Sequence, residues 1–198
     1  QRQMCIRDRI YGHEKDSFNE EDWTDTDAEG CSAYNKSKTY AEKAAWDFIN
    51  SDECNMELSV INPSLVLGPV LESDFGTSVE LVKRFLNGGF PLAPNISFGI
   101  VDVRDVAQLH LLALESPQAS GNRFIASSET LAIPLISEFL RKKIPEYQKR
   151  LPKGTAPDFL IKLLGFFSPL MKTVANQLGK TKELDNSKAK NILGWQPR

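Results

Sequence analysis

The sequence has few residues of the kinds that build metal sites, disulfide frameworks or nucleic-acid surfaces. Its 198 residues include only three cysteines and two histidines, and the formal net charge is -2. Cys31 and Cys54, the cysteines outside the first nine residues, have no metal-like spacing, and a disulfide framework needs more of them. We therefore expect no metal, a reducing and cytoplasmic setting, and no basic field for nucleic acid.

Long apolar runs are also lacking. The longest apolar stretch, 159–171, carries Lys162 and is interrupted by Gly165 and Pro169. It falls short of the ~18 residues that a membrane-spanning helix needs, so no membrane partner is expected. With 41% hydrophobic residues, the chain still has enough apolar side chains for a core.

The segment from Ser32 to Asn50 contains few helix breakers, and Ser32 is suited to cap it, so we predict a helix. Tyr34 and Lys38 are four residues apart and share a face of this helix. Three small or apolar residues follow on that face, and we expect them to lie against a sheet: Ala41, Ala45 and Phe48.

A tyrosine with a lysine one helical turn away has a specific chemical use. The phenol normally loses its proton near pH ~10, and a neighbouring ammonium favours the phenolate and lowers that pKa. Such a hydroxyl can protonate a carbonyl oxygen while a hydride reaches the carbon. The alternative is a surface tyrosine beside an incidental lysine.

The rest of the chain alternates helices with strands, which predicts an α/β fold with a parallel sheet. Asn62 and Pro63 end the first strand, the position at which ligands bind open α/β sheets. Thr77 or Ser78 is expected to cap the next helix, and the acidic segment 10–31 is predicted to be a loop fixed by Phe18 and Trp23. The predicted strands are 56–61, 96–103 and 122–126, and the predicted helical segments are 76–86, 104–115, 131–143, 156–178 and 187–193.

Several motifs in succession resemble one family. Tyr34-x-x-Ser37-Lys38-x-x-Ala41-Glu42 is similar to the catalytic helix of the extended short-chain dehydrogenase/reductases. The longer stretch 32–48 resembles their branch of dihydroflavonol 4-reductase-like and aldehyde or ketone reductases, within the NAD-dependent epimerase/dehydratase superfamily. Further matches follow in the expected order at 62–69, 97–107 and 193–197.

The resemblance implies the C-terminal part of a Rossmann-like doubly wound parallel sheet, with a small, mostly helical substrate-binding region. The family's Gly-rich phosphate-binding turn is missing from the sequence, as is the catalytic serine expected shortly before Ile10-Tyr11-Gly12. Residues 4–9 match the translation of a transposase end used in sequencing libraries, so we expect 1–9 to be a non-native leader. The expected domains are a partial catalytic region, 10–130, and a substrate-binding region, 131–198.

The function implied is NAD(P)H-dependent reduction of an aldehyde or ketone, with NADP favoured over NAD. Tyr34 would be the general acid and Lys38 its partner; the chain alone is expected to be inactive. A sugar-nucleotide epimerase or dehydratase and a non-catalytic binding module remain alternatives, and a homodimer formed through the Tyr34 helix is left open. The implied cofactor-binding residues are Tyr34, Lys38, Asn62, Pro63, Ser64, Leu65, Thr77 and Ser78.

The apolar stretch 159–171 falls in the region that the resemblance assigns to substrate selection. Its apolar character favours a less polar substrate over a nucleotide sugar. A hydrophobic lid over the substrate is one interpretation, but we expect most of these side chains to pack in the core.

Overall fold

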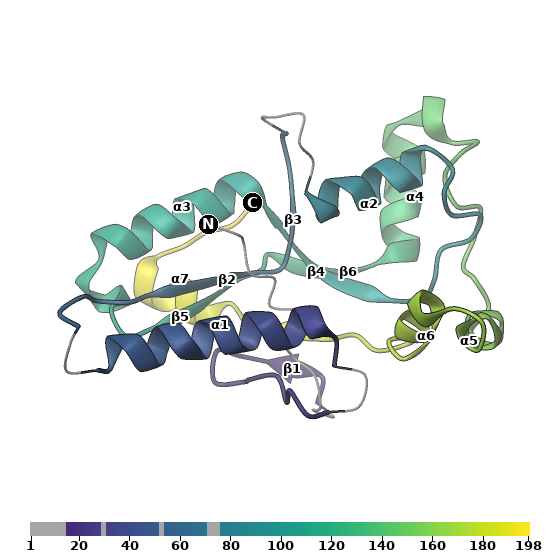
Figure 1. The fold of residues 1–198 in the computed structure, drawn as a ribbon. Coiled ribbons are helices and arrows are strands. Elements are labelled where there is room, and N and C mark those ends of the chain that lie inside the picture. The colour runs from purple at the N-terminus through teal and green to yellow at the C-terminus, as the bar shows by residue number, and fades with distance from the viewer. Residues whose placement is uncertain (1–14, 29–30, 52–53, 71–75) are drawn as a thin grey trace. The chain divides into compact units, whose positions relative to one another are not determined.

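The computed structural model describes residues 15–28, 31–51, 54–70 and 76–198 (Figure 1). The predicted leader, the Ile10-Tyr11-Gly12 segment and His13 lie outside these residues. The chain divides into two compact units that alternate along the sequence. The first comprises Gln1–Gly68, Gly99–Glu129 and Glu183–Arg198, and the second comprises Pro69–Phe98 and Thr130–Lys182.

The first unit carries short parallel strands. Strand β2 (Val60–Pro63) pairs with β5 (Arg123–Ala126), and β1 (Ser17–Phe18) pairs with β7 (Glu183–Leu184). Strand β3 (Leu65–Leu67) pairs in parallel with β4, and β4 is followed in its sheet by β6. The bounds of these last two strands are Ser97–Asp102 and Glu129–Ala132, and residues 97–98 and 130–132 of them belong to the second unit. Parallel pairing of strands linked through helices confirms the α/β class.

The core of this unit lies between its strands and two helices, α3 (Val103–Glu115) and α7 (Ser187–Leu193). The Trp195 side chain is fully buried there, and its indole Nε1 donates a hydrogen bond to the Asp105 carbonyl oxygen at 2.9 Å. Gly194 ends α7 with a positive φ of 63°, a conformation in which glycine is favoured. The buried apolar residues of this core include Val101, Val106, Leu109, Phe124, Ala126 and Leu193.

The second unit is mostly helical. It contains α2 (Thr77–Leu86), α4 (Ile133–Lys143), α5 (Asp158–Gly165) and α6 (Pro169–Ala175), with α5 and α6 packed against each other. The described residues also include two single turns of 3-10 helix, η2 (Pro117–Ala119) in the first unit and η3 (Pro145–Tyr147) in the second.

The structure confirms the predicted helical segments, except that 156–178 contains two helices, α5 and α6, with a break between them, and it corrects several boundaries. Strand β2 begins at Val60 and not at residue 56, because its ladder with β5 starts there. The segment predicted as a loop, 10–31, contains strand β1, and β3, β6 and β7 were not predicted. The N-cap of α2 is Gly76, without a side-chain hydrogen bond, so the predicted cap at Thr77 or Ser78 is wrong.

Candidate active site

Helix α1 (Ala33–Ile49) carries the tyrosine and the lysine of the predicted site. It begins where predicted, since the Ser32 Oγ accepts a hydrogen bond from the Asn35 amide at 3.1 Å. Tyr34 lies in the first turn with 46% of its surface exposed. The Lys38 Nζ lies 5.4 Å from the centroid of the Tyr34 ring, so the ammonium is next to the phenol as the spacing predicted.

The buried face of α1 is not the predicted one. Ala41 and Phe48 are exposed, so the expectation that the Tyr34 face lies against a sheet is wrong. The face that is buried is polar and consists of Asn35, Thr39 and Glu42. The periodicity of apolar residues could not predict this polar face. The one sequence feature that pointed to it is Glu42, the last residue of the motif that begins at Tyr34. As a result, Tyr34 is on the side of the helix that a ligand can reach.

The end of β2 brings the predicted cofactor-binding residues together. Asn62, Pro63 and Ser64 are buried, and Leu65 opens strand β3. The Ser64 amide and Oγ both donate to the Ala126 carbonyl oxygen, at 3.0 and 3.3 Å, which ties this turn to the end of β5. Figure 1 shows α1 running in the opposite direction to β2, so that the first turn of α1 and the last residue of β2 lie toward the same end.

Asn62 has an unusual environment for a buried amide. Its side chain is fully buried, yet within the part of the chain that the structure describes neither Oδ1 nor Nδ2 has a hydrogen-bond partner. A buried amide normally finds a partner, because an unmet donor or acceptor is costly. Asn62 lies at the carboxyl end of β2, so its amide is placed to form hydrogen bonds with a polar group that is not among the described residues, such as a bound cofactor.

Thr77 and Ser78 belong to the other unit, in the first turn of α2. Ser78 is half-buried. The structure therefore groups six of the eight predicted residues in one unit, and leaves these two in the second.

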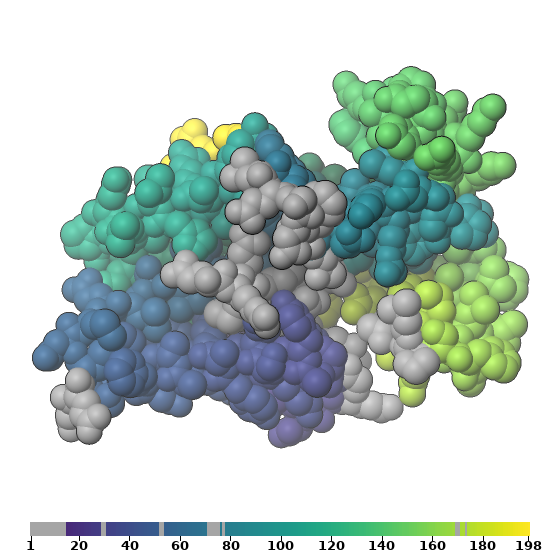
Figure 2. Space-filling view, turned by 45° about the horizontal axis from the view of Figure 1, so that its top comes forward, coloured from purple at the N-terminus to yellow at the C-terminus, as the bar shows by residue number. Residues whose placement is uncertain are grey.

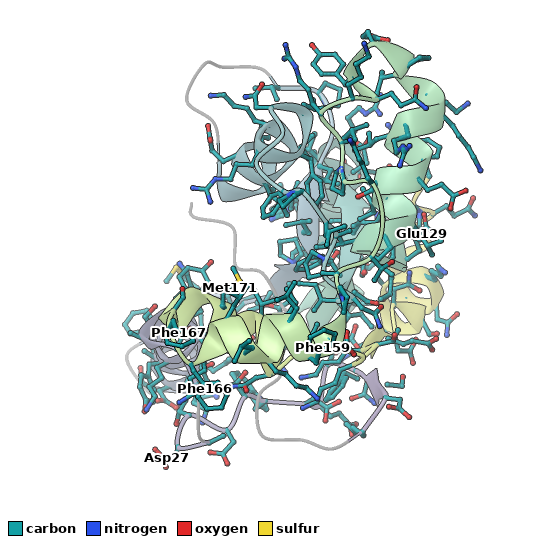
Figure 3. The ribbon with its side chains drawn as sticks, turned by 90° about the vertical axis from the view of Figure 1, so that its right-hand side faces the viewer. Asp27, Glu129, Phe159, Phe166, Phe167 and Met171 are labelled. Carbon is teal, nitrogen blue, oxygen red and sulfur yellow. The ribbon has the colours of Figure 1, made fainter. Side chains whose placement is uncertain are left out.

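The apolar side chains of α5 are not in the core, so the expectation of core packing is wrong for most of them. Phe159, Phe166 and Phe167 are 72%, 85% and 81% exposed, and Ile161 is the buried residue of the helix. Figure 3 shows Phe159 near one end of α5 and the other two phenylalanines at its opposite end. The helix is apolar on most sides and packs on α6, which leaves much of its apolar surface uncovered.

Two kinds of site are absent from the described residues. Over those ranges, no cluster of three or more His, Cys, Asp or Glu side chains could hold a metal ion. None of the helices that the structure describes is long and apolar enough to cross a membrane.

Comparison with known proteins now identifies the fold. Residues 8–126 match the model of the NAD dependent epimerase/dehydratase family. The chain belongs to this family. The NADPH-dependent methylglyoxal reductase of Saccharomyces cerevisiae is 33% identical over 195 residues, which cover 92% of this chain and 53% of the yeast protein. A ketoreductase of Aspergillus niger is 37% identical over 172 residues, covering 81% of this chain and 45% of the fungal protein.

A solved structure gives the same result. The yeast methylglyoxal/isovaleraldehyde reductase, crystallised with NADPH, aligns with a TM-score of 0.69 at 30% sequence identity. The alignment covers 92% of this chain and 53% of the yeast chain. The chain thus spans about half the length of the relatives it matches, and it corresponds to their C-terminal part.

Proposed function

We propose that this chain provides the proton-transfer residues of an NADPH-dependent reductase that converts an aldehyde or ketone to an alcohol. The observation that carries the proposal is the Tyr34–Lys38 pair, with the lysine Nζ 5.4 Å from the tyrosine ring and the tyrosine half exposed. The names of the relatives support the class of reaction and the choice of NADPH over NADH.

In this scheme the Tyr34 hydroxyl donates its proton to the carbonyl oxygen of the substrate. The Lys38 ammonium, one helical turn away, stabilises the phenolate that remains, because opposite charges attract. Lys38 also holds the ribose next to the nicotinamide. When bound, NADPH supplies the hydride, which no protein side chain can do.

The end of β2 would hold the nicotinamide. Asn62 offers an amide whose donors and acceptor are unmet within the described residues, and the main chain of Pro63, Ser64 and Leu65 follows it directly. An amide and main-chain groups suit the carboxamide of the nicotinamide ring, which needs both donors and acceptors. Thr77 and Ser78, in the first turn of α2, are proposed as cofactor-binding residues of the second unit.

The exposed phenylalanines of α5 and of the turn that follows it support a substrate with an apolar part. Phe159, Phe166 and Phe167 offer aromatic surface on the second unit, which we propose selects the substrate. A nucleotide sugar would instead need a cationic site for its diphosphate. We therefore propose an aromatic or aliphatic aldehyde or ketone as the substrate class.

Tyr34→Phe tests the proposal in the gene product that contains this chain. Loss of the proton donor is expected to lower kcat by at least about 100-fold, with little change in the Kd for NADPH. The measurement is NADPH oxidation with an aromatic aldehyde, with a nucleotide sugar as the comparison substrate. Tyr40→Phe is the matched control, since Tyr40 is also on α1, is 53% exposed, and should keep normal turnover. Normal turnover by Tyr34→Phe would refute the assignment.

A further inference from the structure

A buried ionic cluster lies outside the proposed site and connects α1 to the rest of the first unit. The Arg123 Nε donates to the Glu42 Oε1 at 2.7 Å, and the two side chains are only 9% and 0% exposed. Glu42 belongs to α1 and Arg123 opens β5, 81 positions later in the sequence. A buried pair of this kind needs close geometry and further hydrogen bonds to offset the loss of hydration.

The remaining contacts of Arg123 supply those hydrogen bonds. Its Nη1 donates to the main-chain carbonyl oxygens of Glu20 and Asp22. The guanidinium carbon lies 3.9 Å from the centroid of the Trp23 ring, which is stacking distance for a cation on an aromatic face. One side chain therefore joins three segments: α1, β5 and the residues after β1.

Glu20 closes the cluster from the other side. Its Oε1 accepts a hydrogen bond from the Ile125 amide at 2.9 Å, two residues after Arg123 on the same strand. Burial raises the pKa of Glu20 and lowers that of Arg123 to about 10, as expected for charges removed from water. A cleft of about 270 Å³ opens beside the cluster, and none of the predicted site residues lines it.

The buried residues of α1 are polar or charged. They are Asn35, Thr39 and Glu42, so the ion pair is a main tertiary contact on the buried side of this helix. Apolar contacts are non-directional and tolerate small rotations of a helix, whereas a charge-assisted hydrogen bond fixes direction. Tyr34 lies on the same helix, about 12 Å away along its axis at about 1.5 Å per residue. A rotation permitted at Glu42 would therefore move the Tyr34 hydroxyl.

We infer that Glu42 and Arg123 are positioning residues that set the rotation of α1 and thereby aim the Tyr34 hydroxyl at the substrate carbonyl. This inference rests on the function proposed above. Neither residue touches substrate or cofactor; their effect passes through the helix. They are expected to influence the chemical step and not the binding of either ligand.

Replacement of both charges by an apolar pair tests the inference in the gene product that contains this chain. Methionines of similar length often maintain or raise stability when they replace a buried ion pair. Arg123→Met also removes the donor to the Glu20 and Asp22 carbonyl oxygens, so Glu42→Met with Arg123→Met is assayed well below its own unfolding midpoint. The folded double variant is expected to lose about 10- to 100-fold in kcat, since small misplacement of a catalytic group costs that much. The KM values for NADPH and aldehyde should stay within about twofold, as expected when binding is unaffected.

Single variants and controls make the result specific. Glu42→Gln should lower kcat in the same way, and its effect should not add to that of Arg123→Met if the pair acts as one unit. Glu138→Gln makes the same chemical change in an exposed pair with Lys142 and should leave kcat unchanged. A larger isotope effect with deuterated NADPH is expected in the double variant, because the chemical step becomes slower.

The outcomes separate this inference from the proposed function. If Tyr34→Phe abolishes turnover while the folded double methionine variant keeps a normal kcat, the positioning role is refuted and the reductase assignment stands. If the double variant changes KM and leaves kcat unchanged, the positioning role is likewise refuted. Normal turnover by Tyr34→Phe overturns both.

Discussion

Asp102 is a single residue that ends one element and begins the next. It is the last residue of β4 and the N-cap of α3, where its Oδ1 accepts from the Arg104 amide at 2.8 Å. The Arg104 guanidinium also donates to both carboxylate oxygens, at 2.9 and 2.7 Å. The side-chain hydrogen bond from Arg104 is the main reason that the pKa of Asp102 falls to about 2.

Removal of this carboxylate should therefore destabilise the protein in a pH-dependent way. Asp102→Ala is expected to lower the free energy of unfolding by about 1 kcal/mol at neutral pH, the usual cost of a lost N-cap. The folded pKa lies below the ordinary aspartate value near ~3.9, so the charge stabilises the fold above that value. Its contribution is lost as the pH falls from ~4 through about 2.

Urea unfolding at pH 6 and pH 3 would measure this effect. The difference between the parent and Asp102→Ala should shrink at the lower pH. Asp102→Asn is the matched variant, since it keeps a capping oxygen and loses the charge, and it should show the smaller cost at pH 6. An equal difference for Asp102→Ala at both pH values would contradict the argument.

At the scale of elements, β4 approaches the ends of β2 and β5 closely because residue 99 has no side chain. A Cβ built on Gly99 would lie 2.7 Å from the Leu184 Cδ1, 2.9 Å from the Ser127 Oγ and 3.1 Å from the Ser64 Cβ. Gly99→Ala should therefore lower the free energy of unfolding by about 1–3 kcal/mol, as overpacking usually does. Thermal unfolding would measure it.

Gly154→Ala is the control for this substitution. Nothing lies within 4 Å of a Cβ at that position, so no overpacking is expected. Equal unfolding midpoints for the two variants would show that β4 can move away from its neighbours without loss of stability. The argument that close packing requires a glycine at position 99 would then be wrong.

Local sequence patterns predicted the elements better than they predicted the surfaces that those elements bury. Helix α1 was predicted from Ser32, and α3 from its Val106 and Leu109 periodicity, because a cap and an apolar face are both local signals. The short strands β1, β3 and β6 carry no such signal, since two to four residues show no period. These segments are extended because they form hydrogen bonds with strands that are distant in the sequence.

The buried face of α1 shows why the rest could not be predicted. Glu42 is buried only because Arg123 meets it from a strand distant in the sequence, and no local rule predicts that partner. The apolar face that the sequence suggested is exposed instead, and the residues of α1 form open surface in Figure 2. The Tyr34–Lys38 pair, in contrast, was predicted because it depends on helix geometry alone.

At the scale of the whole molecule, the two units share the chain in alternation. Residues 69–98 and 130–182 form the second unit, and the first unit resumes between and after them. The proposed proton-transfer residues and the exposed phenylalanines therefore lie in different units. The proposed reductase also needs a site for the phosphates of NADPH.

That last requirement leads to a prediction about the chain alone. None of its 12 glycines belongs to a Gly-x-Gly-x-x-Gly sequence, the motif whose turn holds a dinucleotide pyrophosphate at a helix N-terminus. The purified 198-residue chain should therefore bind NADPH weakly. In a titration followed by NADPH fluorescence, it should not saturate at ~100-fold the NADPH concentration that saturates the yeast reductase. It should also not oxidise NADPH with any aldehyde.

A fusion supplies the matched comparison. The N-terminal half of the yeast methylglyoxal reductase, joined ahead of this chain, should restore NADPH binding if the missing turn is the cause. Turnover by that fusion should then disappear with Tyr34→Phe and persist with Tyr40→Phe. Tight NADPH binding by the 198-residue chain would instead locate a phosphate site among its own residues. It would contradict the expectation that a Gly-rich turn outside this sequence holds the pyrophosphate.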